Sequence, residues 1–186
     1  MPAPLVLASA SPRRLALLAQ IGIVPDTVVA TAIDESPHPR ELPRAHALRL
    51  ARAKAEAAAL LHPHARVLAA DTVVGVGRRI LPKAENEAQA RACLALLSGR
   101  RHRVFTGVCL IAPGRLPRMR LGESIVTFKR LSQAETERYI ATGEWQGKAG
   151  GYAIQGHAAA FTKFLSGSHS NVVGLPLYET AQLLAG

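Results

Sequence analysis

The stretch VLAADTVVGV, residues 67–76, indicates the fold class of this chain. Its first four residues form an apolar run typical of a buried strand, and residues 72–76 continue it in extended, mostly β-branched sequence. One acidic residue, Asp71, follows the apolar run directly. Binding and catalytic side chains of α/β proteins lie at such strand ends, so the stretch predicts both a central strand and a site.

Strand and helix patterns alternate on both sides of this stretch. The expected strands are residues 5–8, 24–33, 67–76, 103–111 and 118–128. The expected helices are residues 12–21, 43–61, 85–97, 132–142 and 176–184, and the glycine- and serine-rich residues 147–174 are expected to form loops. This alternation predicts an α/β protein with a mixed sheet flanked by helices. The length of 186 residues suits a single domain, 1–186, with two lobes that share one sheet.

The composition excludes several classes of protein. With 48% apolar and 19% charged residues, the chain is not expected to be disordered. No apolar run approaches the roughly 18 residues that a membrane span requires. The arginines near the N-terminus follow the apolar residues instead of preceding them, so no secretory signal is expected. Cys93 and Cys109 lie in apolar sequence without metal-binding spacing, which favours reduced core cysteines in a cytoplasmic protein.

The net charge of +10 favours an anionic partner. Nucleic acids, nucleotides and other phosphates all fit that charge. Proteins that bind single strands stack bases on aromatic side chains, and aromatic residues make up only 4% of this chain. A small phosphorylated ligand is therefore the expected partner, and nucleic acid is not.

The segment SASPRR, residues 9–14, follows the first expected strand and opens the first expected helix. Free backbone N–H groups and the helix dipole favour an anion at this place, and Arg13 and Arg14 add forked donors suited to phosphate oxygens. The alternative is an ordinary helix N-terminus, capped by Ser11, with a solvated arginine pair.

Lys54 falls inside the apolar stripe of the helix expected at residues 43–61. The stripe consists of Ala47, Leu50, Ala51, Ala58 and Leu61, whereas Arg49, Arg52 and Glu56 lie on the other face. A lysine that faces the core needs a carboxylate or a bound anion as its partner. Snorkelling at the edge of the stripe is the alternative.

Two acidic positions follow expected strands. Asp71 precedes Thr72, and Glu35 follows Asp34 after the strand expected at residues 24–33. Carboxylates among several cations, with Lys83 as a further one, fit phosphate chemistry assisted by Mg²⁺. The alternative for the Asp-Thr pair is a simple turn cap.

The glycine-rich segment GKAGGYAIQG, residues 147–156, allows close approach of the backbone to a ligand. The amide of Gln155 both donates and accepts, so it can read the imide edge of uracil or thymine. A structural turn is the alternative. His169, in a later polar loop, has no second histidine or cysteine at metal-binding spacing and is expected to be an ordinary loop residue.

In this order, the segments LVLASASPRRLALL, IDES, LARAKA, AADTVV, LLSGRRHRVFTGV, GKAGGYAIQG and SNVVGLPL resemble the Maf family of nucleoside triphosphate pyrophosphatases. The likeness covers nearly the whole chain. It implies an elongated mixed sheet with a cleft between two lobes, often in a homodimer. It also implies that the chain is a hydrolase that uses a divalent cation. The expected reaction cleaves the bond between the α- and β-phosphates and releases a nucleoside monophosphate and pyrophosphate.

The resemblance implies roles for the first site residues along the chain. Ser9, Arg13 and Arg14 match the phosphate-binding segment of the family. Glu35 and Asp71 match the acidic pair that holds Mg²⁺ or Mn²⁺, and Asp71 is expected to position or deprotonate the attacking water.

The remaining matches concern the triphosphate and the base. Lys54 and Lys83 resemble the lysines that neutralise the triphosphate, although the family reads lysine-proline after a glycine where this chain has Pro82 before Lys83. Thr72 and Gln155 resemble the residues that mark the dTTP/UTP branch. The alternatives are the 7-methyl-GTP branch of the same family and a basic module that binds nucleic acid or regulates division without turnover.

Overall fold

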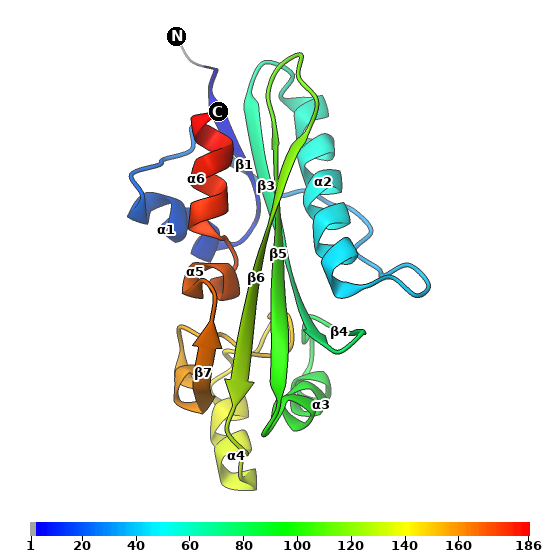
Figure 1. Ribbon diagram of the computed structural model, residues 1–186, viewed down its shortest axis with the longest axis vertical. Coiled ribbons are helices and arrows are strands. Elements are labelled where there is room, and N and C mark those ends of the chain that lie inside the picture. Colours follow the sequence, from blue (N-terminus) through cyan, green and yellow to red (C-terminus); the bar gives the residue numbers. More distant parts are fainter. Residues whose placement is uncertain (1–2) are drawn as a thin grey trace.

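The computed structural model describes residues 3–186; the first two residues of the predicted domain, Met1 and Pro2, lie outside the described part. The molecule is elongated along three long strands (Figure 1). The strands are β1 (Leu5–Ala8), β2 (Thr27–Val29), β3 (Arg66–Val76), β4 (Arg79–Leu81), β5 (Arg101–Ile111), β6 (Arg118–Phe128) and β7 (Thr162–Ser166). The helices are α1 (Pro12–Gln20), α2 (Pro43–Leu61), α3 (Glu87–Leu97), α4 (Gln133–Ala141), α5 (His169–Val173) and α6 (Leu177–Ala185), with a 3-10 helix at His157–Phe161.

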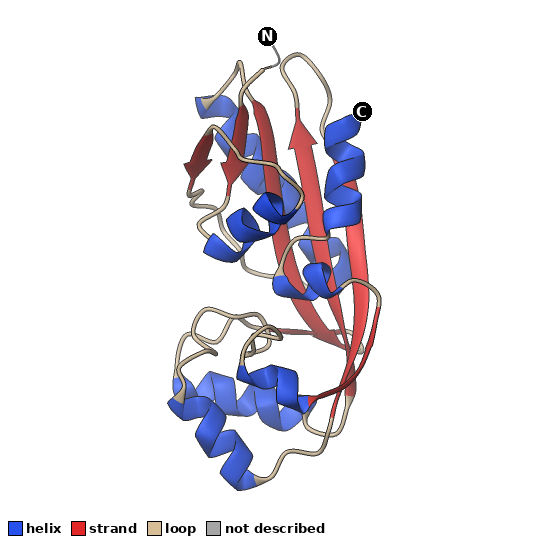
Figure 2. Ribbon diagram, turned by 90° about the vertical axis from the view of Figure 1, so that its left-hand side faces the viewer, coloured by secondary structure: helices blue, strands red, loops and turns tan. Residues whose placement is uncertain are grey.

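The strands form one mixed sheet in the order β2-β1-β3-β5-β6-β7, with β4 also paired to β3. β1 runs parallel to β2 and β3, and the other pairs are antiparallel. β3, β5 and β6 have 11 residues each, which corresponds to about 35 Å of extended chain. These strands run through both lobes of the molecule (Figure 2), so the predicted α/β fold with two lobes on one sheet is confirmed.

The two faces of β3 pack against different helices because its side chains alternate. Val67 and Ala69 pack with the alanine stripe of α2. Leu68 and Ala70 pack on the other face, with leucines of α1 and α6. The same alternation sends Asp71 toward α2 and Thr72 toward α1 and α5, so neighbouring residues serve opposite faces of the sheet.

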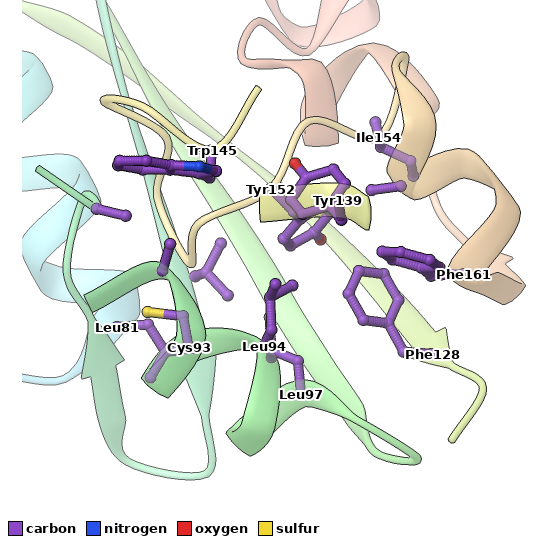
Figure 3. Packing of buried hydrophobic residues seen from close by; sticks show 14 of the residues in the cluster. Leu81, Cys93, Leu94, Leu97, Phe128, Tyr139, Trp145, Tyr152, Ile154 and Phe161 are labelled. Carbon is purple, nitrogen blue, oxygen red and sulfur yellow. The ribbon is translucent and has the colours of Figure 1, made fainter. Parts of the chain in front are cut away.

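An aromatic cluster forms the core of the lobe that contains α3 and α4 (Figure 3). Phe128 stacks edge-on with Tyr152 at a centroid distance of 4.8 Å, and Tyr139 packs with Phe161 at 5.5 Å. The hydroxyl of Tyr152 also bonds His102 Nε2 at 2.8 Å. Burial lowers the pKa of His102 to about 4, so this imidazole is neutral. Because Tyr152 and Ile154 belong to the cluster, it anchors the glycine-rich segment 147–156 to this lobe.

Three sequence expectations about elements are wrong in part. The strand expected at 24–33 is reduced to Thr27–Val29, because this exposed edge pairs with β1 through only three residues. The expected loops 147–174 contain a 3-10 helix, β7 and α5, which are short elements without a periodic apolar pattern. The hydroxyl of Ser11 makes no capping bond to α1; instead, the Ser11 N–H donates to Ser9 Oγ at 3.2 Å.

The expectation that the two cysteines are unpaired core residues is confirmed. Cys93 and Cys109 are free and buried. None of the helices in the described residues is long and apolar enough to cross a membrane.

Close packing of α2 on the sheet predicts a cost for any side chain at Gly107. A Cβ there would lie 2.8 Å from the carbonyl carbon of Ala47 and 3.0 Å from Leu48 Cα, so α2 or β5 would have to shift. We expect Gly107→Ala to lower the free energy of unfolding by about 2–3 kcal/mol in urea titrations. Gly114→Ala, where a Cβ meets no neighbour but φ is +69°, should cost only about 1 kcal/mol. Equal losses in the two variants would contradict the packing argument.

Candidate active site

The cleft lies where β3 lacks a partner along one edge. β5 pairs with the opposite edge from Val67 to Gly75, so β1 and β4 share the other edge. β1 pairs with β3 only as far as Ala69, and β4 pairs with β3 only from Val74 onward. Residues 70–73 therefore have no strand partner on this edge. A cleft of about 350 Å³ opens at this gap, lined by residues 8–14, Thr31, Glu35, Lys54, Thr72, Val74, Lys83, residues 147–149, Tyr152, Ala153, Gln155 and residues 172–174.

Four side chains form a lysine–carboxylate cluster: Glu35, Lys54, Asp71 and Lys83. Lys54 Nζ lies 2.6 Å from Glu35 Oε1 and 2.6 Å from Asp71 Oδ1. Lys83 Nζ pairs with Glu35 Oε2 and lies 3.9 Å from Asp71 Oδ1. Lys54 therefore has the carboxylate partners that its place in the apolar stripe predicted, and the snorkelling alternative is wrong.

The electrostatics of the lysine–carboxylate cluster keep Glu35 ionised. Burial raises the pKa of Glu35, but the hydrogen bonds from Lys54 and Lys83 outweigh this effect and bring it to about 2. Asp71 is only 2% exposed, and its Oδ2 has no hydrogen-bond partner in residues 3–186. A buried carboxylate oxygen without a donor is costly, which indicates a position where a ligand or water binds.

Lys83 reaches the cluster through a short backbone pairing between two segments. The N–H of Ala84 donates to Lys148 O at 3.1 Å, and the N–H of Gly147 donates to Ala84 O at 2.8 Å. Lys83 and Ala149 form an isolated antiparallel bridge. This pairing places the Lys83 ammonium beside Glu35 even though Pro82 precedes it.

Arg14 is buried, and its guanidinium bonds to the protein itself. Its Nε donates to Gly174 O at 2.7 Å, and its other nitrogens donate to Ser9 Oγ at 3.1 Å and Thr72 Oγ1 at 3.2 Å. Burial lowers the pKa of Arg14, and the charge of Asp71 partly offsets that effect. Arg14 therefore ties α1, the end of β1, β3 and the segment after α5 together at the cleft, and the alternative of a solvated arginine pair is wrong for this residue.

Arg13 differs from Arg14 because its side chain lines the cleft with no carboxylate or hydrogen-bond partner in the described part of the chain. Burial lowers its pKa. The N-terminus of α1 beside it carries no side-chain cap. Both features suit an anion from outside the protein.

The two residues expected near the base lie in different surroundings. Thr72 Oγ1 bonds Thr106 Oγ1 at 2.9 Å and accepts from Arg14, on the face of β3 opposite Asp71. Gln155 is exposed and lines the cleft, and its side-chain amide has no bond to residues 3–186. The structure thus places eight of the nine predicted site residues on the lining of one cleft. The ninth, Asp71, is buried and bonds to the lining residue Lys54.

Lys148 and Tyr152 are among the cleft residues that sequence reasoning did not assign to the site. Both stand in the quoted glycine-rich segment, and the charge of Lys148 was the available signal. Asp34, in contrast, is not at the cleft: its carboxylate accepts from the Ser36 N–H at 2.9 Å and is exposed. His169 begins α5 and is exposed, as an ordinary surface residue would be.

A metal ion at this site would depend on few protein ligands. Residues 3–186 contain no group of three or more histidine, cysteine, aspartate or glutamate side chains that could hold an ion. Glu35 and Asp71 do meet at Lys54, and Asp71 Oδ2 is unpartnered. Mg²⁺ is commonly held by one or two carboxylates, with substrate phosphates and water as the other ligands. The residues present fit that arrangement.

The chain resembles known proteins over nearly its whole length. A family model described as "Maf-like protein" matches residues 4–186. A protein named dTTP/UTP pyrophosphatase from Novosphingobium aromaticivorans is 66% identical over 180 residues, covering 97% of this chain and 90% of that protein. Another of that name from Paramagnetospirillum magneticum is 65% identical over 185 residues, covering 99% and 97%. The solved structure of a HAM1 protein from Coxiella burnetii shares the fold, with a TM-score of 0.52 at 17% identity over 97% of this chain and 98% of that chain.

The buried pair of Lys54 and Asp71 predicts a strong coupling in stability. Lys54→Met leaves the Asp71 carboxylate without its nearest cation, so we expect a loss of about 3–5 kcal/mol in the free energy of unfolding at neutral pH. Adding Asp71→Asn to that variant removes the unpaired charge and should restore most of the loss. Lys163→Met, at an exposed position on β7, is the matched control and should change stability by less than about 0.5 kcal/mol. Equal stability of the single and double variants in urea titrations would contradict the coupling.

Proposed function

This chain belongs to the Maf family, and from that membership we propose that it hydrolyses dTTP and UTP to the nucleoside monophosphate and pyrophosphate. The observation that carries the proposal is the lysine–carboxylate cluster at a cleft whose remaining cations form no ion pair with a carboxylate in residues 3–186. The names of the two relatives, both above 60% identity, support the choice of substrate.

The charges of the cleft suit a triphosphate. The lining carries Arg13, Arg14, Lys54, Lys83 and Lys148, and the carboxylates of the site are Glu35 and Asp71. Cations arranged beforehand around a transferring phosphoryl group stabilise the charge that develops on it and on the leaving group. In this proposal the lysines neutralise the triphosphate, and Arg13 with the uncapped N-terminus of α1 binds phosphate oxygens. Arg14, with its donors directed at the protein, holds that segment in place.

Asp71 is the candidate base for the attacking water. Its Oδ1 accepts from Lys54, which holds the carboxylate in one orientation, and its Oδ2 has no hydrogen-bond partner among the described residues. Phosphate oxygens of the substrate would give Lys54 a further anionic partner and weaken its bond to Oδ1. The freed carboxylate can then orient a water toward the α-phosphorus and accept its proton.

A divalent cation, Mg²⁺ or Mn²⁺, would be held by Glu35 and Asp71 together with the phosphates. When bound, it would neutralise negative charge on the phosphate chain and so lower the barrier to attack. The Glu35 carboxylate suits this role because its low pKa keeps it ionised at every pH near neutrality.

Base selection falls to Gln155 in this proposal, with Thr72 as a second residue of the dTTP/UTP branch. The amide of Gln155 is exposed in the cleft and has no hydrogen-bond partner in the described part of the chain, so it can match the acceptor and donor pattern of a uracil or thymine ring. No feature of the cleft favours 7-methyl-GTP or a module without turnover.

We also propose that residues 1–186 act as a single domain in the cytoplasm and as a homodimer. The two buried free cysteines suit a reducing compartment. Leu60, Leu61 and Leu116 expose 78–86% of their surface at the end of α2 and the turn after β5, and a second copy would cover apolar side chains of this kind. Size-exclusion chromatography with light scattering measures the assembly.

The reaction is tested by incubating the purified chain and Mg²⁺ or Mn²⁺ with dTTP, UTP, CTP and 7-methyl-GTP. We expect pyrophosphate from dTTP and UTP and none after chelation with EDTA. Asp71→Asn should lower kcat by about 100-fold or more while the urea unfolding transition remains cooperative. Orthophosphate as the only product would mean cleavage of a different bond, and full turnover in Asp71→Asn would exclude Asp71 as the base.

If Gln155 recognises the nucleotide base, Gln155→Ala should lose selectivity for UTP over CTP. The ratio of kcat/KM for UTP to that for CTP should fall by about tenfold, because one amide hydrogen-bond pair discriminates by about 1.4 kcal/mol. Gln133→Ala, at an exposed position on α4 outside the cleft, is the control and should leave the ratio unchanged. An unchanged ratio in Gln155→Ala would remove the residue from base recognition.

A further inference from the structure

Three lining cations form no ion pair with a carboxylate in the described part of the chain: Arg13, Arg14 and Lys148. Lys54 and Lys83 already bond to Glu35 and Asp71, and Arg14 donates to the protein. The charges of Lys54 and Lys83 are therefore largely compensated, and the guanidinium of Arg14 is held in place by its bonds to the protein. Lys148 and Arg13 carry the charge that remains available to a ligand.

The backbone around Lys148 is rigid. Its carbonyl accepts from the N–H of Ala84 at 3.1 Å and of Gly151 at 2.9 Å, and its own N–H donates to Trp145 O at 3.1 Å. Gly150 has a φ of +68°, and a Cβ there would lie 3.0 Å from Val74, so the turn is pressed against β3. Lys148 thus extends from a fixed point and not from a free loop.

Lys148 and Arg13 come to the cleft from opposite lobes. Arg13 lies in the first turn of α1, and Lys148 lies in the segment that packs on the aromatic cluster. Burial lowers the pKa of Lys148, the charge of Arg13 lowers it further, and Glu144 acts in the opposite sense. Two cations that repel each other across a cleft bind an anion placed between them more strongly than either does alone.

The protein contacts of Lys148 leave donors free. Its Nζ donates to Gln146 O at 3.0 Å, and the ammonium has three N–H groups. Glu144, the carboxylate that acts on it, is itself held by the N–H and the ring of His157. No carboxylate in residues 3–186 forms an ion pair with Lys148, so its remaining donors can reach phosphate oxygens.

We propose that Lys148 is a further phosphate-binding residue of this site, and that with Arg13 it clamps the triphosphate between the two lobes. The proposal rests on the proposed function for the identity of the substrate. The binding of the phosphate chain follows from the cleft alone, so it can be measured without turnover.

The test compares Lys148→Met, Lys148→Arg and Lys163→Met. Methionine keeps most of the length and the apolar stem of lysine but removes its charge, and Lys163→Met makes the same change at an exposed position outside the cleft. Calorimetric titration with inorganic tripolyphosphate probes the phosphate chain without the nucleoside. Steady-state kinetics with UTP then separates KM from kcat.

We expect Lys148→Met to weaken tripolyphosphate binding and to raise KM for UTP by about tenfold, the factor that corresponds to 1.4 kcal/mol. Lys148→Arg should recover both values to within about threefold, and Lys163→Met should match the wild type. Because Lys148 and Arg13 act on one ligand, the effects of Lys148→Met and Arg13→Met should be non-additive.

The outcomes separate this proposal from the proposed function. Release of pyrophosphate from UTP with equal tripolyphosphate binding by wild type and Lys148→Met would overturn the role of Lys148 and leave the function standing. Weakened binding in Lys148→Met without pyrophosphate release from any nucleotide would support the clamp and overturn the function. No binding of tripolyphosphate to the wild type would overturn the clamp.

Discussion

The ion pair between Lys54 and Asp71 is the interaction on which the site depends. It joins α2, on one face of the sheet, to β3 at the centre of the sheet. Glu35, which lines the cleft, forms a second ion pair with Lys54. Burying these charges costs free energy that the mutual bonds only partly return. A protein that needed stability alone would be better served by apolar residues at these positions. The pair is therefore best understood through the chemistry of the cleft, where a lysine between two carboxylates can exchange one of them for a phosphate.

The position of the cleft follows from the lengths of the strands. β1 has four residues and β3 has eleven, so the edge of β3 is bare just beyond the end of β1, and β4 covers it again only from Val74. The alternation of side chains along β3 then sends Asp71 to one face and Thr72 to the other. β3 thereby directs the Asp71 carboxylate toward α2 and the Thr72 hydroxyl toward Arg14. Residues from both faces of the sheet therefore meet at one gap.

The sequence predicted the parts of this arrangement that local patterns encode. The buried strand at residues 67–76 and the core-facing position of Lys54 follow from periodicity, and both are confirmed. The apolar stripe of α2 is also confirmed except at Leu61, the last residue of the helix, which is 78% exposed. β7 and α5 were missed because they are five residues long and are held by tertiary contacts, such as those of the Asn171 amide with Val104 O and Ser124 Oγ. The buried bonds of Arg14 and the pairing of residues 82–84 with 147–150 were also beyond reach, since they join segments far apart in the chain.

In the described part of the chain, the two lobes are joined by continuous strands and not by a flexible linker, because β3, β5 and β6 pass through both without interruption. A hinge that closed the cleft would have to bend a ladder of hydrogen bonds across these strands, whereas proteins that rotate whole domains do so at a few loop residues. The backbone of this cleft is therefore stiff, and adjustment to a ligand falls to long side chains. We therefore expect ligands to be selected by their fit to a preformed slot, and we expect rotamer changes of the lining side chains, not domain motion, to limit the opening of the cleft.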